Sequence, residues 1–176
     1  MALSRRKAYD RPERGLNLKR IAVYAGSFDP ITSGHLDLVR RATGLFDEVV
    51  LAIGNNPAKR YLLSTETRRS VLEACTADLD NVSVDVFSGL LIDYCKTRGA
   101  GFILRGLRAV TDFEFEFQIG LANMDMSPDI ETVFLLTEPR NIFISSSLVK
   151  EIASNGGDVS KYLPAPAHSA LMAAIG

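Results

Sequence analysis

The 176-residue chain has no tryptophan, only two cysteines and only two histidines. No apolar run reaches the ~18 residues that a membrane span requires. Cys75 and Cys95 stand alone, without Cys-x-x-Cys spacing, which favours two small buried apolar residues in a reducing compartment. We therefore expect a cytoplasmic protein that neither spans a membrane nor depends on disulfides.

The chain has little net charge, because 20 Lys/Arg nearly balance 21 Asp/Glu and leave a formal net charge of -1. This balance gives no general footprint for nucleic acid. The charge is uneven, however, with seven Lys/Arg against two acidic residues through Arg20. Residues 1–19 are predicted to be a basic, disordered extension, and residues 20–176 a single domain. No signal-peptide pattern follows the basic residues, and a role as a nucleic-acid arm or transit peptide stays open.

Short apolar runs alternate with segments of helical periodicity along the rest of the chain. The runs that predict strands are residues 21–24, 48–54, 82–86, 102–104 and 132–136. This alternation predicts an α/β fold with a parallel five-stranded sheet and helices on both faces. In such sheets ligands bind beyond the carboxyl ends of the strands, so the loops there are the first place to look for a site.

Residues 24–35 form the junction between the first strand and the helix that follows. A strand, a glycine-containing loop and a helix start direct free backbone N–H groups and a positive dipole end at one place, which suits phosphate. Gly26 and Gly34 let the backbone approach a ligand, Ser27 supplies a hydroxyl, and His35 can donate an N–H. Each residue alone is also typical of local capping.

Further polar residues follow three other predicted strands. Lys59 lies in the loop after the second strand, and Arg105-Gly106-Leu107-Arg108 follows the fourth directly. Two arginines that flank a glycine can bind two anionic groups, although surface ion pairs are an equal interpretation. Ser145, Ser146 and Ser147 precede a helix expected from residue 148, where they could cap the helix or hold a triphosphate.

The helix expected from Asp112 to about Met126 is rich in aromatic residues. Phe113 and Phe117 are four residues apart and share one face. We expect these rings to form core or subunit contacts rather than to stack on a base.

Several motifs together resemble a known enzyme family. Gly26-Ser27-Phe28-Asp29-Pro30 with Thr32-Ser33-Gly34-His35 resembles the signature loop of the nucleotidyltransferase superfamily. The further motifs are Asn56-Pro57-Ala58-Lys59, Arg105-Gly106-Leu107-Arg108, Asp112-Phe113-Glu114 and residues 144–151. With them, the chain from about Ile21 to Ile175 resembles the bacterial phosphopantetheine adenylyltransferases. The resemblance implies a Rossmann-like nucleotidyltransferase domain that assembles as a homohexamer.

The resemblance also implies an activity. Members transfer the adenylyl group of ATP to 4'-phosphopantetheine, giving dephospho-coenzyme A and pyrophosphate in the penultimate step of coenzyme A biosynthesis. It implies Mg2+ held through substrate phosphates and water, with no metal site on the protein. Coenzyme A would be a feedback inhibitor, and neither nucleic acid nor membrane would be a partner. Because the acceptor is already a phosphate anion, the reaction needs positioning and charge neutralisation rather than a general base.

Site residues carry over by motif position. The resemblance implies catalytic roles for His35 as transition-state stabiliser, with Ser27 and Lys59. It implies contacts with phosphopantetheine by Ser27, Lys59, Leu91 and Arg105. It implies an ATP site made of Ser27, Phe28, His35, Gly106, Leu107, Arg108, Glu116, Asn141, Ile142, Phe143, Ile144, Ser145, Ser146 and Ser147.

Two other functions stay open. A nucleotidyltransferase with another acceptor, such as nicotinate mononucleotide, would share the signature loop, although Lys59 with Arg105 argues against it. A catalytically idle subunit that senses coenzyme A would share the fold, although intact Ser27 and His35 argue against it. A tRNA synthetase is a weaker alternative still, because we expect no room in the chain for a tRNA-binding domain. The chain departs from the family at Ala25, where many members have proline.

Overall fold

The computed structural model describes residues 19–108 and 110–176. The basic extension predicted at 1–19 lies outside these residues, apart from Lys19. Lys19 Nζ lies 2.7 Å from a carboxylate oxygen of Glu48, and the Arg20 guanidinium donates to Asp47. Both contacts hold the start of the domain against the strand that begins at Glu48.

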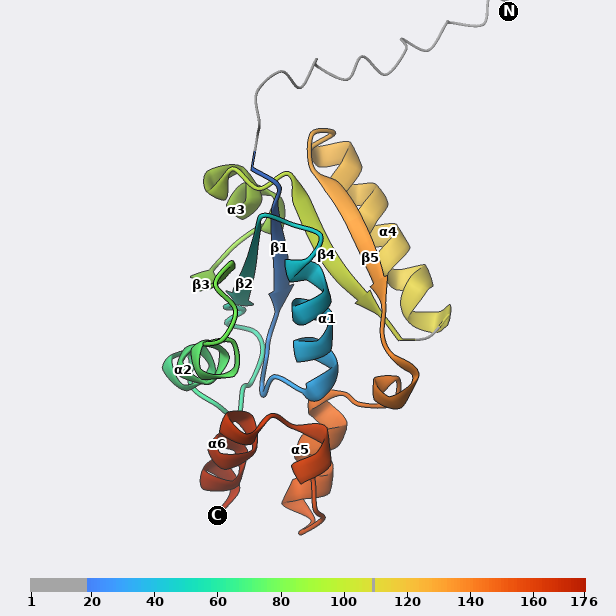
Figure 1. Cartoon of the computed structure of the whole chain (residues 1–176). Coiled ribbons are helices and arrows are strands. Elements are labelled where there is room, and N and C mark those ends of the chain that lie inside the picture. Colours follow the sequence, from blue (N-terminus) through green and yellow to red (C-terminus); the bar gives the residue numbers. More distant parts are fainter. Residues whose placement is uncertain (1–18, 109) are drawn as a thin grey trace, which may run out of the picture.

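Five parallel strands form one sheet in the order β3-β2-β1-β4-β5 (Figure 1). Their bounds are β1 Ile21–Gly26, β2 Glu48–Gly54, β3 Val82–Phe87, β4 Phe102–Leu107 and β5 Glu131–Leu136. The central strands β1 and β2 are nearly continuous runs of buried apolar residues, as expected for parallel strands covered on both faces. The predicted α/β class and five-stranded parallel sheet are confirmed.

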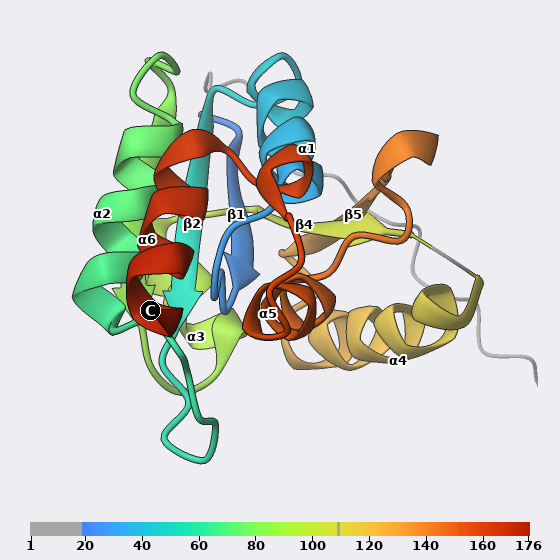
Figure 2. The same cartoon turned by 90° about the horizontal axis from the view of Figure 1, so that it is seen from below.

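The described residues include six α-helices, and helices lie on both sides of the sheet (Figure 2). Their bounds are α1 Ser33–Thr43, α2 Thr65–Cys75, α3 Leu91–Arg98, α4 Val110–Met126, α5 Ser146–Ser154 and α6 Ala165–Ile175, with short 3-10 turns at Pro139–Asn141 and Ser160–Tyr162. One core lies under α1, α2, α5 and α6, and the other lies under α3. Cys75 is buried in the first and Cys95 in the second, both as free thiols.

Side-chain caps set where several helices begin. Ser64 caps α2, because its hydroxyl accepts a hydrogen bond from the Thr67 amide at 3.1 Å. Ser145 caps α5 in the same way through the Leu148 amide at 3.1 Å. In the serine triplet, Ser145 is therefore the cap, and Ser146 and Ser147 are the first two residues of the helix.

The strand β4 is longer than the sequence indicated. Arg105 and Gly106 pair with Phe134 and Leu135 of β5. The prediction that the strand ends at residue 104 is therefore wrong, because residues 105–107 belong to β4 rather than to the loop after it. Pairing with the neighbouring strand continues the ladder through a segment whose arginine and glycine interrupt the apolar pattern.

Helix α4 carries three phenylalanine rings that the described chain leaves partly exposed, although Phe113 meets Phe134 of β5 edge-on. Phe113, Phe115 and Phe117 are exposed, with Phe115 at 65%. The core interpretation is therefore wrong for these rings in the single chain, while a subunit contact stays a prediction. At 17 residues α4 is the longest described helix, and no helix in the described ranges is long and apolar enough to cross a bilayer.

The strand order reverses between β1 and β4, the point at which a doubly wound sheet opens a crevice. The chain leaves β1 toward β2 on one side and leaves β4 toward β5 on the other. Loops that follow neighbouring strands then run in opposite directions, and a space is left beyond their carboxyl ends. The sheet topology places the candidate site there.

Candidate active site

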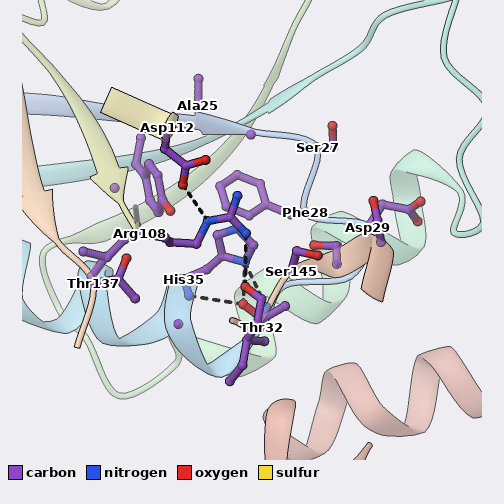
Figure 3. A pocket seen from close by; sticks show the side chains of 18 of the residues that line it. Ala25, Ser27, Phe28, Asp29, Thr32, His35, Arg108, Asp112, Thr137 and Ser145 are labelled. Carbon is purple, nitrogen blue, oxygen red and sulfur yellow. Dashed lines mark hydrogen bonds and ion pairs between the residues drawn. The ribbon is translucent and has the colours of Figure 1, made fainter. Parts of the chain in front are cut away.

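A cavity of about 810 Å³ lies beyond the ends of β1 and β4 (Figure 3). It is lined by the loop after β1, the loop after β2, the end of β4, the first half of α4 and the start of α5. Thirteen of the predicted site residues line it: Ser27, Phe28, His35, Lys59, Arg105, Gly106, Arg108, Glu116, Asn141, Ile144, Ser145, Ser146 and Ser147. Segments far apart in the sequence thus meet around one space large enough for a nucleotide.

Four predicted site residues do not line this cavity. Leu91 is half-buried at the start of α3 and packs on the core beneath that helix. Leu107 ends β4 opposite Leu136 of β5. Ile142 and Phe143 are exposed, and the Phe143 ring meets Tyr162 edge-on. Contacts between these four residues and a substrate stay predictions.

His35 is held by the residue that caps its own helix. The Thr32 amide donates to Nδ1 of His35 at 3.0 Å, and the Thr32 hydroxyl accepts from the His35 amide at 3.4 Å. Because Nδ1 accepts this bond, the proton of the neutral ring is on Nε2. Phe28, which is buried, packs its ring edge-on against the imidazole. The ring is therefore fixed in orientation and tautomer.

The surroundings of His35 keep the ring neutral. Burial of the imidazole lowers its pKa to about 4, and the positive charge of Arg108 adds to the effect. At neutral pH the ring is then a hydrogen-bond donor through Nε2–H and has no free lone pair for a proton. It suits a site where an oxyanion needs a donor, not one where a substrate needs a base.

The two arginines near the end of β4 are both fixed by carboxylates on α4. Arg105 Nε donates to Glu116 at 2.7 Å, and its Nη2 donates to the other oxygen of the same carboxylate. Arg108 Nε donates to Asp112 at 3.1 Å, and its Nη1 donates to the Ile144 carbonyl at 3.3 Å. A guanidinium has five N–H donors, so each arginine keeps donors for a ligand.

Sequence reasoning assigned no role to Asp29 and Lys150, which form a third fixed pair. Asp29 accepts from the Leu62 and Leu63 amides at 3.0 and 2.8 Å, and from Lys150 Nζ at 2.6 Å. Burial opposes ionisation, but these donors outweigh it and hold the pKa of Asp29 below its usual value. Lys150 follows Ser146 by four residues, so both lie on one face of α5, and this spacing could have indicated it.

Arg68 was also missed, although it supports the loop after β1 from behind. Its side chain is 1% exposed, and its Nη1 donates to the Ser27 carbonyl at 2.8 Å. Nη2 donates to the Thr65 hydroxyl at 3.0 Å, and the guanidinium lies 4.1 Å from the centre of the Tyr61 ring. The indicator in the sequence was an arginine three residues before Val71, on the buried face of α2.

The carboxylates around the cavity are paired with cationic side chains and so are poorly placed to coordinate a metal ion. Asp29, Asp112 and Glu116 each contact a lysine or arginine. Over residues 19–108 and 110–176, no group of three or more His, Cys, Asp or Glu is placed to bind a metal. Mg2+ prefers oxygen ligands and keeps much of its water, so this cavity fits a magnesium ion that arrives on phosphates. That the protein has no metal site of its own stays a prediction.

The fold and this site define the chain as a nucleotidyltransferase. The family model for cytidylyltransferase-like proteins matches residues 23–152. A Vibrio parahaemolyticus structure, provisionally assigned as a nicotinate-nucleotide adenylyltransferase, superimposes with a TM-score of 0.65 at 20% identity, over 88% of this chain and 99% of that one. At that identity the likeness shows the fold alone.

Curated relatives show which family of nucleotidyltransferases the chain resembles. Phosphopantetheine adenylyltransferase from Caldanaerobacter subterraneus subsp. tengcongensis is 50% identical over 82% of this chain and 91% of its own. The Heliobacterium modesticaldum protein of the same name is 52% identical over 87% of this chain and 90% of its own. The chain belongs to the phosphopantetheine adenylyltransferase family.

We expect His35 to titrate near pH 4 and to carry its proton on Nε2 above that pH. An unfolded histidine has a pKa of about 6.5, so the unfolded chain takes up this proton first. The contribution of His35 to stability is therefore complete above about pH 6.5 and is lost as the pH falls toward about 4. Nitrogen NMR of the imidazoles checks this, with His168→Gln to isolate the His35 signals. A pKa near 6.5, or a proton on Nδ1, would contradict it.

Proposed function

We propose that the chain transfers the adenylyl group of ATP to 4'-phosphopantetheine, giving dephospho-coenzyme A and pyrophosphate in the penultimate step of coenzyme A synthesis. The observation that carries the proposal is one cavity lined by both the neutral histidine donor His35 and several lysine and arginine side chains. The names of relatives about half identical to this chain support the choice of substrates.

The proposed chemistry is a single in-line displacement. A phosphate oxygen of the acceptor attacks the α-phosphorus of ATP, and a new P–O bond forms. The bond from the α-phosphorus to the oxygen shared with the β-phosphate breaks, and its electron pair leaves with pyrophosphate. No proton has to be removed from the attacking oxygen, which agrees with a His35 that has no free basic nitrogen. Donation from Nε2–H to the charged oxygens in the transition state would contribute about 3 kcal/mol.

Charge is distributed so that two anions can be brought together. Lys59 is exposed on the loop after β2, and its ammonium has no ion-pair partner in the described part of the chain. Arg105 is already paired with Glu116, so it adds oriented donors but little net charge. On this basis Lys59 attracts the phosphate of the acceptor and Arg105 orients it. Arg108 and residues 145–147 at the start of α5 face the phosphates of ATP.

The proposal also includes a metal ion, an assembly, a regulator and a location. Mg2+ would be bound by the ATP phosphates and water and would neutralise their charge, and no step above depends on it. The exposure of Phe113 and Phe117 on one side of α4 supports a subunit contact in a homohexamer. Feedback inhibition by coenzyme A is supported by the family resemblance, and a cytoplasmic location by the lone cysteines Cys75 and Cys95, which are buried as free thiols.

Pyrophosphate release by the purified chain tests the function. We expect release with ATP, Mg2+ and 4'-phosphopantetheine, and none with nicotinate mononucleotide or without an acceptor. His35→Ala should lower kcat about 10²- to 10³-fold while ATP binding persists, because the donor acts on charge that develops in the transition state. Release with nicotinate mononucleotide instead would overturn the acceptor. Retained ATP binding with no turnover by the unmodified chain would favour a sensor.

Lys59→Met should raise the KM for phosphopantetheine about ten- to hundredfold, because a hydrogen bond to a charged group is lost from the acceptor phosphate. The KM for ATP should change little. Steady-state kinetics in which each substrate is varied in turn measure both constants. Lys161→Met is the matched control, because Lys161 does not line this cavity. An equal rise in both KM values, or none, would remove Lys59 from the acceptor site.

A further inference from the structure

Arg68 is a buried cation that has no carboxylate partner in the described part of the chain. The residue is 1% exposed, it takes part in none of the described ion pairs, and its Nε has no hydrogen-bond partner among the described residues. A charge buried in this way costs stability, so packing alone does not explain it. The next residue, Arg69, is exposed and pairs with Glu73, as is usual for a surface arginine.

The Arg68 guanidinium is nevertheless held in one orientation. Its Nη1 donates to the Ser27 carbonyl at 2.8 Å, and its Nη2 donates to the Thr65 hydroxyl at 3.0 Å. The Tyr61 ring lies on the guanidinium, with 4.1 Å between the ring centre and the central carbon. The Tyr61 hydroxyl donates in turn to the Gly54 carbonyl at 3.3 Å, which fixes the ring. A guanidinium held in this way can fix the orientation of the carbonyl to which it donates.

The group that Arg68 fixes is the peptide unit between Ser27 and Phe28. This peptide is trans, so its C=O and N–H point in opposite directions, and the Phe28 amide points away from Arg68. Ser27 and Phe28 line the cavity and Arg68 does not, so the amide faces the side on which the cavity lies. Within the described chain the Phe28 amide donates to no other residue. It is therefore a donor that a substrate can use.

The backbone of Phe28 is strained. Its φ is 47°, in the left-handed region that bulky residues rarely adopt. Such a conformation persists only where the surroundings impose it, and it is found mostly at functional sites. The Phe28 ring is buried and packs edge-on against Tyr24 and His35 (Figure 3), and Arg68 holds the carbonyl that precedes it. The ring on one side and the guanidinium on the other thus impose the turn.

We propose that Arg68 is a positioning residue for the proposed adenylyl transfer, on which this inference rests. Arg68 holds the Ser27–Phe28 peptide so that the Ser27 hydroxyl and the Phe28 amide donate to the substrate phosphates. Donors that are fixed before the reaction stabilise the charge that develops in the transition state. Arg68 itself contacts no substrate and moves no proton.

A purely structural role predicts different behaviour. If Arg68 only stabilised the fold, a folded variant would keep its kcat, and removal of the Ser27 hydroxyl would have the same effect with or without Arg68. If Arg68 positions the peptide, its loss makes the Ser27 hydroxyl less useful, and the two effects do not add. Arg68→Lys separates these roles, because an ammonium keeps the charge but has no rigid fork of donors.

The experiment measures kcat and Tm for Arg68→Lys, Ser27→Ala and the double variant. We expect Arg68→Lys to lower kcat about ten- to hundredfold, because a small misplacement of catalytic donors has a large effect on rate. Ser27→Ala should then lower kcat much less in the Arg68→Lys background than in the unmodified chain. Arg69→Gln is the matched control, since it breaks the exposed pair with Glu73 on the same helix and should leave kcat unchanged.

An unchanged kcat in Arg68→Lys, or effects of the two changes that simply add, would overturn the proposal. Turnover by the unmodified chain is measured in parallel, so failure of the adenylyl transfer itself is seen separately. A crystal structure of Arg68→Lys gives a readout that does not depend on turnover. It should show the Ser27 carbonyl turned and Phe28 outside the left-handed region, and an unchanged peptide would overturn the role.

If Arg68→Lys does not fold, Thr65→Val decides. Valine has nearly the shape of threonine but lacks the hydroxyl that accepts from Nη2 of Arg68, and Thr65 does not line the cavity. We expect kcat to fall severalfold, and the effect to combine with Ser27→Ala less than additively. A kcat equal to that of the unmodified chain would contradict the positioning role.

Discussion

The parallel pairing of β1 with β2 on one side and β4 on the other is the constraint on which the site depends. Because β1 is central, the loop that follows it lies at the reversal of strand order and borders open space rather than a neighbouring loop. The register brings Gly26 level with Ile53 of β2, and so aligns the loops that carry Ser27 and Lys59 at one edge. The remaining site segments are added around this edge.

The charged side chains around the cavity form cation–carboxylate pairs. Each pair fixes the position of a lysine or arginine and leaves some of its N–H donors free for a ligand. Arg105 with Glu116, Arg108 with Asp112, and Lys150 with Asp29 each hold a cation in place through a carboxylate. The Arg68 guanidinium has no such carboxylate among the described ion pairs, and it holds the Ser27 carbonyl from behind. Lys59 lines the same cavity and has no ion-pair partner among the described residues. The site is therefore organised to receive anions with little rearrangement, which lowers the cost of binding.

Much of the fold could be predicted from local patterns. Five apolar runs, the cap at Ser64 and the helix end at Gly99, where the backbone is left-handed, all follow from short-range preferences. The signature loop identified Ser27 and His35 because its glycines and polar residues are close in sequence. The extension of β4 through Leu107 could not be predicted, since it depends on pairing with a strand that comes much later.

The same limit explains the site residues that sequence reasoning missed. Lys150 meets Asp29 across 121 positions, and Arg68 meets Ser27 across 41. Only the folded chain brings these partners together. The pair Phe113 and Phe117 of α4 shows the opposite problem. Its spacing is typical of a buried helix face, but both rings stay partly exposed, although Phe113 meets Phe134 of β5.

The central claim is that His35 donates a hydrogen bond to a transition state formed by direct attack of the acceptor. The most direct test is the stereochemical course at the α-phosphorus, followed with ATP made chiral there by sulfur substitution. One in-line displacement predicts inversion of configuration. Retention would mean two displacements through a covalent adenylyl-enzyme, and would contradict the assignment of His35 as a neutral donor.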